Sequence, residues 1–302
     1  MKKISILFSL FVFSISTYSY TLTGFIPKQG NRIHYVALFD KTQFELLDSV
    51  VTDNKGNFSI DIPSRYKGIV KVILKDNRMA KETINASIDT QTLYLFLDGS
   101  DFSFKAYWGL YSEDLQIGLG KAPTDAIEKM SVYLNNGSKR LNLICKLLDT
   151  YTASDSIAKV LGCEYKREIL NEQSYCDSLS NEFPDSSLVR TSISLLKPLY
   201  IPIELNQKGK DAWRVEHFFD HMNLKDENIL HLPDFFVRMN EYMNICKPIG
   251  LSKTKDIDSN IVDAAQRILK LTKENKDLNQ GVYAILENIL IRENKAYLLE
   301  KI

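Results

Sequence analysis

The structure of the N-terminal part of this chain is indicated most clearly by the stretch Asp53-Asn54-Lys55-Gly56-Asn57-Phe58-Ser59-Ile60-Asp61-Ile62. Its second half alternates apolar and polar residues, which is the period of a strand that buries one face and turns the other toward water. Its first half is rich in turn-forming residues, and Gly56 can adopt the positive φ that a bulged loop needs. The stretch therefore predicts a hairpin turn followed by a strand over Asn57–Ile62.

Similar patterns recur on both sides of this stretch, from Tyr20 to about Leu110. Short runs rich in Val, Ile, Phe, Tyr and Thr are separated by turn residues, which is typical of β-strands. The other predicted strands are Tyr20–Ile26, Arg32–Phe39, Phe44–Thr52, Ile69–Leu74, Thr92–Leu97 and Phe102–Tyr107. Several short strands spaced by turns predict an antiparallel β-sandwich or barrel-like domain over residues 20–118.

The apolar period changes after Gly118-Leu119-Gly120. From there to the end, apolar residues recur three and four positions apart, as on the buried face of a helix. Four helix starts are predicted: a capping box at Asp125-Ala126-Ile127-Glu128, and starts at Thr152–Asp155, Pro184-Asp185 and Pro233-Asp234. Residues 119–302 are thus predicted to form an all-α domain of about six to eight helices. The expected fold class is α+β.

Residues 1–19 have the layout of a secretory signal peptide. Lys2 and Lys3 precede an uncharged apolar run over Ile4–Ile15, and small and hydroxyl residues follow up to Ser19. The run is too short for a spanning helix, which needs about 20 apolar residues. We therefore expect export, cleavage after Ser19, an extracytoplasmic and specifically periplasmic location, and no membrane span in the mature protein.

The overall charge is balanced, with 38 Lys and Arg residues against 38 Asp and Glu residues. A net charge of zero argues against recognition of nucleic acid through the bulk electrostatic field. The sequence leaves the oligomeric state open.

The densest cluster of reactive side chains lies between Trp213 and His221, with His231 ten residues later. His217 and His221 are spaced so that one helical face could present both imidazoles to a metal. A zinc hydrolase would place a glutamate beside the first histidine as general base, but that position holds Phe218. We therefore expect a structural role for this region and assign no metal site.

The four cysteines all lie in the predicted helical domain, at Cys145, Cys163, Cys176 and Cys246. No pair forms the Cys-x-x-Cys motif of a redox site. Cys145 and Cys163 flank the predicted Thr152–Ser156 turn almost symmetrically, which makes them the candidate disulfide of an antiparallel helix pair. Buried free thiols are the alternative.

The sequence contains no motif that identifies a catalytic or cofactor-binding residue. It has neither a Gly-x-Ser-x-Gly nucleophile elbow nor a Walker loop or dinucleotide fingerprint. The aromatic run Tyr107–Tyr111 is predicted to pack at the seam between the two domains, with stacking on a sugar or peptide as the alternative. No cofactor is expected.

Two sets of motifs resemble parts of a known family. The first set is Gly24-Phe25-Ile26, Leu47-Asp48-Ser49-Val50 and Asp53-x-x-Gly56-x-Phe58. The second comprises Trp213-x-x-x-His217-Phe218-Phe219-Asp220-x-x-Asn223-Leu224-x-Asp226, then Ile229-Leu230-x-x-Pro233 and Tyr242, with a short match at Phe183-Pro184-Asp185-Ser186. Together they resemble the N-terminal β domain and the following helical segment of TlpA-like envelope thiol–disulfide oxidoreductases.

The resemblance implies a location in the cell envelope and an architecture of a β domain followed by a helical domain, but it implies no catalytic residue. Such proteins continue into a thioredoxin fold with a Cys-x-x-Cys pair, which would begin near Ile302, and no residue here matches those cysteines. We therefore expect a non-catalytic envelope module that binds or positions a thioredoxin-like or other envelope protein. Structural roles are expected for Trp213, His217, Phe219, Asp220, Asn223, Asp226 and Pro233. The alternatives are a truncated or atypical thiol–disulfide oxidoreductase and a surface glycan- or peptide-binding protein.

Overall fold

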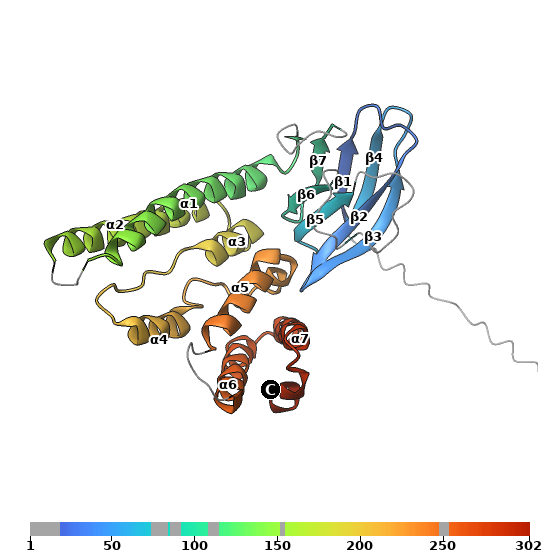
Figure 1. Ribbon diagram of the computed structural model, residues 1–302. Helices are drawn as coiled ribbons and strands as arrows, with labels where there is room; N and C mark the ends of the chain where they lie inside the picture. Colours follow the sequence, from blue (N-terminus) through green and yellow to red (C-terminus); the bar gives the residue numbers. More distant parts are fainter. Residues whose placement is uncertain (1–18, 74–83, 85–91, 108–114, 152–154, 248–253) are drawn as a thin grey trace, which may run out of the picture.

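The computed structural model describes residues 19–73, 84, 92–107, 115–151, 155–247 and 254–302. It has the predicted α+β organisation, with β-strands in the N-terminal part and helices after them (Figure 1). The predicted signal peptide falls almost entirely outside the described residues, and so do positions 108–111 of the aromatic run. The strands are β1 (Ser19–Phe25), β2 (Ile33–Asp40), β3 (Gln43–Val51), β4 (Asn57–Pro63), β5 (Gly68–Ile73), β6 (Thr92–Leu97), β7 (Phe102–Lys105) and β8 (Gln116–Ile117).

The strands form two four-stranded sheets with the orders β4-β1-β7-β8 and β3-β2-β5-β6. Neighbouring strands are antiparallel except β1 and β7, which run parallel with Leu22 opposite Phe102. The sheets are therefore mostly antiparallel rather than wholly so. β1 to β7 overlap the seven predicted strands, whereas β8 was not predicted, because two residues are too few to show a period.

The turn at Asp53–Asn57 forms as predicted, but it is not the turn of a hairpin. It joins β3 to β4, and these strands belong to different sheets. The Asp53 carboxylate accepts hydrogen bonds from the backbone amides of Lys55 and Asn57, both at 2.8 Å, and Gly56 has a φ of 99°. Because the turn is closed by its own side chain, it does not require the flanking strands to pair.

One apolar cluster joins the two sheets. It contains Leu22 and Phe102 from the first sheet and Val36, Val70 and Leu95 from the second. β4 contributes Phe58 and Ile62 to this cluster, and its alternating Ser59 and Asp61 are exposed to solvent.

The helices follow from residue 121 onward. They are α1 (Lys121–Leu148), α2 (Ser156–Ser180), α3 (Leu188–Leu196), α4 (Gln207–His217), η3 (Glu227–His231), α5 (Pro233–Ile245), α6 (Thr254–Thr272), α7 (Lys276–Arg292) and η4 (Ala296–Lys301), the two η elements being 3₁₀-helices. The predicted starts at Asp155 and Pro233 agree with α2 and α5 to within a residue, with Pro233 in the first turn of α5.

Two predicted helix starts are displaced. α1 begins at Lys121 rather than at Asp125, because Pro123 is tolerated in the first turn. Backbone N–H groups of the first turn have no acceptor within the helix, so the N–H that proline lacks is not needed there. α3 begins at Leu188 rather than near Asp185, because the Ser187 side chain accepts the amide hydrogen bond of Val189 and caps the helix there.

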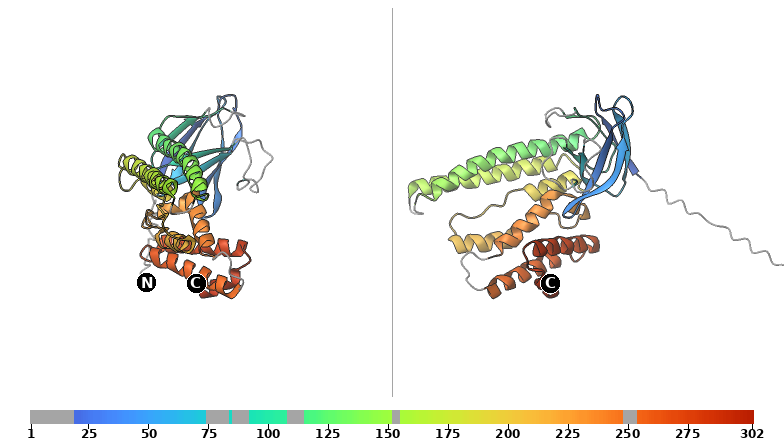
Figure 2. Two further views of the ribbon diagram at one scale, coloured as in Figure 1. Left: turned by 60° about the vertical axis from the view of Figure 1, so that its left-hand side comes forward. Right: turned by 45° about the vertical axis from the view of Figure 1, so that its right-hand side comes forward.

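α1 and α2 form a long antiparallel hairpin whose far end points away from the sheets (Figures 1 and 2). Tyr133 stacks on Tyr175 with ring centroids 3.9 Å apart, and Arg140 Nε donates to Glu168 Oε1 at 2.6 Å. These two contacts fix the register of the hairpin. Within the described residues, no helix combines the length and apolar character needed to cross a bilayer.

Candidate functional site

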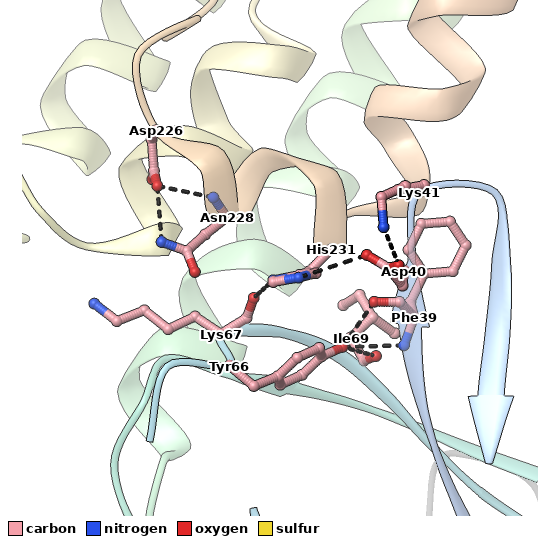
Figure 3. Close-up of polar contacts among 9 residues, drawn as sticks. All are labelled: Phe39, Asp40, Lys41, Tyr66, Lys67, Ile69, Asp226, Asn228 and His231. Atoms are coloured by element: carbon pink, nitrogen blue, oxygen red, sulfur yellow. Dashed lines mark hydrogen bonds and ion pairs between the residues drawn. The ribbon is translucent and has the colours of Figure 1, made fainter. Parts of the chain in front are cut away.

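The two sheets are joined to the helices by a polar seam between the β2–β3 turn and η3 (Figure 3). The backbone amide of Lys41 donates to the carbonyl oxygen of Leu230 at 2.8 Å. Lys41 has a φ of 55°, so the turn adopts the left-handed conformation to make this bond. The seam therefore fixes the end of a strand pair directly to the backbone of a helix.

His231 is the central side chain of the seam. Its Nδ1 donates to the carbonyl oxygen of Lys67 at 3.0 Å, and its Nε2 lies 3.7 Å from Asp40 Oδ1. The imidazole also packs on the Tyr66 ring, with 4.7 Å between centroids. Burial lowers the pKa of His231, opposed by the Lys67 carbonyl and by Asp40. Both ring nitrogens therefore face groups of the β domain, which fixes the imidazole at the seam.

Tyr66 anchors His231 to the β domain. Its hydroxyl accepts a hydrogen bond from the Phe39 amide at 3.0 Å and donates to the carbonyl oxygen of Ile69 at 2.7 Å (Figure 3). The Tyr66 carbonyl in turn accepts from the Tyr20 hydroxyl at 2.9 Å. The ring hydroxyl of Tyr66 is therefore held by β2 and β5 of one sheet, and its backbone carbonyl is held by β1 of the other.

A second contact joins the sheets to the helices at α3. The Asp98 carboxylate, just after β6, accepts from the Leu188 amide and from the Ser187 hydroxyl, both at 2.8 Å. A carboxylate at a helix N-terminus satisfies free amides and complements the helix dipole. Asp98 thus caps a helix from a different part of the fold.

We expect Asp98→Ala to lower the free energy of unfolding by about 1–2 kcal/mol, because it leaves the Leu188 amide and the Ser187 hydroxyl without their acceptor. Urea denaturation followed by circular dichroism would measure the loss. The matched control is Asp61→Ala, which removes an exposed carboxylate of β4 and should change stability by less than about 0.5 kcal/mol. Equal effects of the two substitutions would show that the cap contributes nothing.

A cavity of about 580 Å³ lies along the seam. Its ionisable lining residues are Asp40, Lys41, Glu45, Arg65, Tyr66, Glu227, His231 and Asp277. Acidic side chains outnumber basic ones in this lining, with Asp40, Glu45, Glu227 and Asp277 against Lys41 and Arg65. The seam cavity is therefore suited to polar contacts.

His217 and His221, whose spacing would suit a metal pair on one helix, do not share a helical face. α4 ends at His217, so His221 lies beyond the helix. His217 Nδ1 is 2.7 Å from Asp220 Oδ2 and its ring packs on Trp213, whereas His221 Nε2 faces the side chain of Gln173 at 3.4 Å. The described residues contain no group of three or more His, Cys, Asp or Glu side chains placed to hold a metal.

The remaining motif residues make local structural contacts. Trp213 Nε1 donates to the Tyr200 carbonyl at 3.0 Å, and Phe219 is buried against Tyr242. Asn223 Oδ1 accepts from the Lys225 amide at 3.2 Å. Asp226 caps η3 through the Asn228 amide at 3.0 Å and accepts from the Thr191 hydroxyl at 2.8 Å. The Thr191–Asp226 contact joins α3 to the start of η3, and the Trp213–Tyr200 contact joins α4 to the segment after α3.

The structure contains all four cysteines as free thiols, so the candidate Cys145–Cys163 disulfide is not formed in it. Arg140 contacts Glu168 across the hairpin; Cys145 lies five residues after the first and Cys163 five residues before the second, so the two cysteines lie at the same level along the hairpin axis. A step of five residues turns the side-chain direction by about 140° around each helix axis. The two thiols therefore point to opposite sides of the helix pair. The symmetric spacing in the sequence could predict that the cysteines share a level, but not that their side chains point to opposite sides.

Sequence reasoning did not identify the residues that form the seam. His231 was considered only with the histidine cluster, and Asp40, Tyr66 and Asp98 belong to no motif. Their partners lie far away in the sequence, so no local spacing could reveal them.

No family model, curated protein or solved structure matches this chain. The resemblance to TlpA-like proteins thus stays a prediction based on the motifs given above. Any functional proposal depends on the chain's own geometry.

Proposed function

We propose that this chain is an exported, non-catalytic module of the cell envelope that binds a protein partner through the tip of the α1–α2 hairpin. The observation that carries the proposal is a group of large apolar side chains left in solvent at that tip. The group comprises Leu143, Leu147, Tyr151, Ile157 and Val160, and we call it the tip patch; its members are between 40% and 62% exposed.

The tip patch has members on both helices of the hairpin. Leu143 and Leu147 are one turn apart near the end of α1, and Ile157 and Val160 are one turn apart at the start of α2. The hairpin carries them away from the sheets (Figure 2). Exposed apolar groups that gather in one place, with polar residues around them, mark interaction surfaces.

A protein partner fits this surface better than a lipid bilayer does. The charges beside the tip patch are mixed, with Lys146 and Lys159 against Asp149 and Asp155. An interfacial membrane helix would instead carry mainly Lys and Arg on its polar face. The motif resemblance makes a thioredoxin-like envelope protein the first partner to test.

The cysteines favour binding over redox catalysis. Burial raises the pKa of the Cys145 and Cys246 thiols, and it raises the pKa of Cys176 to about 11. A reactive thiol instead needs a lowered pKa, since the thiolate is the nucleophile. The alternative of a truncated or atypical oxidoreductase therefore gains no support from these three residues. The glycan-binding alternative depends on the aromatic run, most of which lies outside the described residues.

The proposed architecture also assigns the two sheets to one sandwich. The apolar cluster shared by the sheets supports this assignment, since the inner faces of a sandwich interdigitate in the same way. In this view the sandwich and the seam form a fixed base from which the hairpin presents the tip patch.

A photo-crosslinking residue at position 160, introduced into the protein in its native envelope, should give one discrete adduct with a thioredoxin-like protein, identified by mass spectrometry. The matched control is position 170, which also holds an exposed apolar residue of α2 but lies about 15 Å along the helix. That position should give no such adduct.

The identified partner is then purified, and its affinity is measured by calorimetry. Val160→Glu should weaken binding about tenfold or more, because a charge in the contact must be desolvated, while Leu170→Glu should not. The proposal fails if no adduct forms at position 160, or if both positions give the same adducts.

A further inference from the structure

The outer strand β3 presents an unpaired backbone edge. It is the last strand of its sheet, and among the described strands it pairs with β2 alone (Figure 1). No backbone–backbone hydrogen bond joins residues 43–51 to any other described segment, and their side chains are half-buried or exposed throughout. Such a row of N–H and C=O groups can accept a further strand from another chain.

The seam cavity lies directly beside this edge. Glu45, Leu46 and Leu47 of β3 belong to its lining. Leu38 of β2 lines it too and is the register partner of Glu45, so these two side chains lie on one face of the sheet. Residues directly opposite each other in neighbouring strands share a face. A residue added opposite Glu45 would therefore direct its side chain to the cavity.

The cavity wall has a negative balance of charge. Asp40 forms an ion pair with Lys41. Apart from that pair, Tyr66 and His231, the ionisable wall residues are Glu45, Arg65, Glu227 and Asp277. The three acids of this set form no ion pair with any residue that the structure describes. The wall therefore complements a cationic side chain.

His231 and Asp40 present two hydrogen-bond acceptors to each other. The Nδ1 atom of His231 donates to the Lys67 carbonyl, so Nε2 of the neutral imidazole carries a lone pair. Burial lowers the pKa of His231, which favours this neutral form. Its Nε2 lies 3.7 Å from Asp40 Oδ1, and the two side chains, both in the cavity lining, are 22% and 26% exposed. A group with several N–H donors, such as a guanidinium, would bridge the two acceptors.

A second copy of this chain does not fit the edge. It would bring its own Glu45 and Asp48 against those of the first copy, and like charges opposite each other destabilise strand pairing. The β2–β3 register shifts between Val36 and Ala37, which leaves Gln43–Leu46 as the regular segment beside the cavity. A short extended segment with a basic side chain matches both the length and the charge of this site.

We propose that an extended peptide segment of a partner protein adds to the edge of β3 at Gln43–Leu46 and places an arginine or lysine side chain in the seam cavity. Hydrogen bonds to the β3 backbone supply affinity, and the acids of the wall together with the His231–Asp40 pair select the cation. This site is separate from the tip patch, so the present proposal and the proposed function can fail independently.

The test is calorimetric titration of the full chain with the end-blocked peptide Thr-Val-Arg-Val-Thr. Its arginine would lie opposite Glu45, with the valines on the face of Phe44 and Leu46. The peptide should bind with a stoichiometry of one. Citrulline in place of arginine keeps the shape without the charge and should weaken binding about tenfold or more.

Two further peptides test the strand pairing, each N-methylated on one of the two alternating sets of amides. Only the set that faces β3 donates to it, so one of these peptides should bind about tenfold or more weakly and the other nearly as the parent peptide does. Hydrogen exchange should show increased protection of β3 amides on binding and no change in β6, the other edge of the sheet.

Glu227→Gln combined with Asp277→Asn removes two charges of the wall and leaves β3 unchanged. This double variant should bind the arginine peptide about tenfold more weakly and the citrulline peptide as the parent protein does. The matched control, Asp61→Asn with Glu164→Gln, removes two charges outside the cavity lining and should bind both peptides unchanged.

The proposal is overturned if the arginine peptide does not bind or if the citrulline peptide binds as tightly. It is also overturned if both methylated peptides bind like the parent peptide, or if the protection appears on β6 instead of β3. Equal binding of the arginine peptide by the two double variants, with both shown to be folded by circular dichroism, would likewise contradict it.

Discussion

Gly68→Ala should lower the free energy of unfolding by about 2–3 kcal/mol, although alanine in a strand is usually at least as stable as glycine. A Cβ on Gly68 would lie 2.4 Å from the Cβ of His231 and 2.8 Å from its carbonyl oxygen. Neither atom belongs to the flexible end of a side chain, so β5 and η3 would have to separate. Urea denaturation of the parent protein and of Gly68→Ala measures the difference in the free energy of unfolding.

Amide hydrogen exchange should show that Gly68→Ala destabilises the seam first. Separation of β5 from η3 weakens the hydrogen bond from the Lys41 amide to the Leu230 carbonyl, so the Lys41 amide should lose protection before other amides do. Gly209→Ala is the matched control, because the nearest atom to its Cβ is the Leu205 Cβ at 3.3 Å and the residue lies in α4. The control should be within about 1 kcal/mol of the parent protein. If the Gly68→Ala variant is as stable as the Gly209→Ala control, then β5 and η3 can accommodate the added methyl group without cost.

The strands could be predicted from sequence because their burial pattern is local. β4 alternates between buried and exposed residues along the chain, and the same period is readable in the sequence. The partner of each strand is not local. The turn at Asp53–Asn57 favoured a hairpin, yet the structure pairs β4 with β1 and β3 with β2. Turn chemistry closes a turn, but the shared apolar cluster decides which strands meet.

The contacts that join the two parts of the fold could not be predicted, because they join residues far apart in the sequence. His231 meets Lys67, and Asp98 meets Leu188, across separations for which no periodicity exists. Glu172 illustrates a further limit. A glutamate within a helix is normally taken for a solvent-exposed residue, and only the packing of Gly137 against it shows that it is buried.

Glu172→Gln should stabilise the protein above pH 7, by up to about 3 kcal/mol. Glu172 has a folded-state pKa of about 7 against an ordinary value of 4.5, so the folded protein holds this proton more tightly than the unfolded chain does. Stability from this group is therefore complete below pH 4.5 and is lost as the pH rises through 7. A shift of about 2.5 pH units corresponds to about 3 kcal/mol, and glutamine removes this loss.

His34 has the opposite linkage over nearly the same range. Burial lowers its pKa from 6.5 to about 4, so the unfolded chain binds this proton more readily and stability falls as the pH drops from 6.5 to 4. In the parent protein the two groups oppose each other between about pH 4.5 and 6.5, which flattens the dependence of stability on pH. In Glu172→Gln the His34 effect is no longer opposed by Glu172, and its contribution should lower the free energy of unfolding by about 2 kcal/mol on acidification across that range.

Urea denaturation at intervals from pH 4 to pH 8 would measure both effects. The difference between Glu172→Gln and the parent should be near zero at pH 4.5 and grow through pH 7. The control Glu164→Gln changes a partly exposed acid of the same helix, which pairs with Arg167 at the surface, and should shift stability by no more than about 0.5 kcal/mol at every pH. A difference that does not vary with pH would mean that Glu172 titrates alike in the folded and unfolded states, and that its burial between α1 and α2 does not change its pKa.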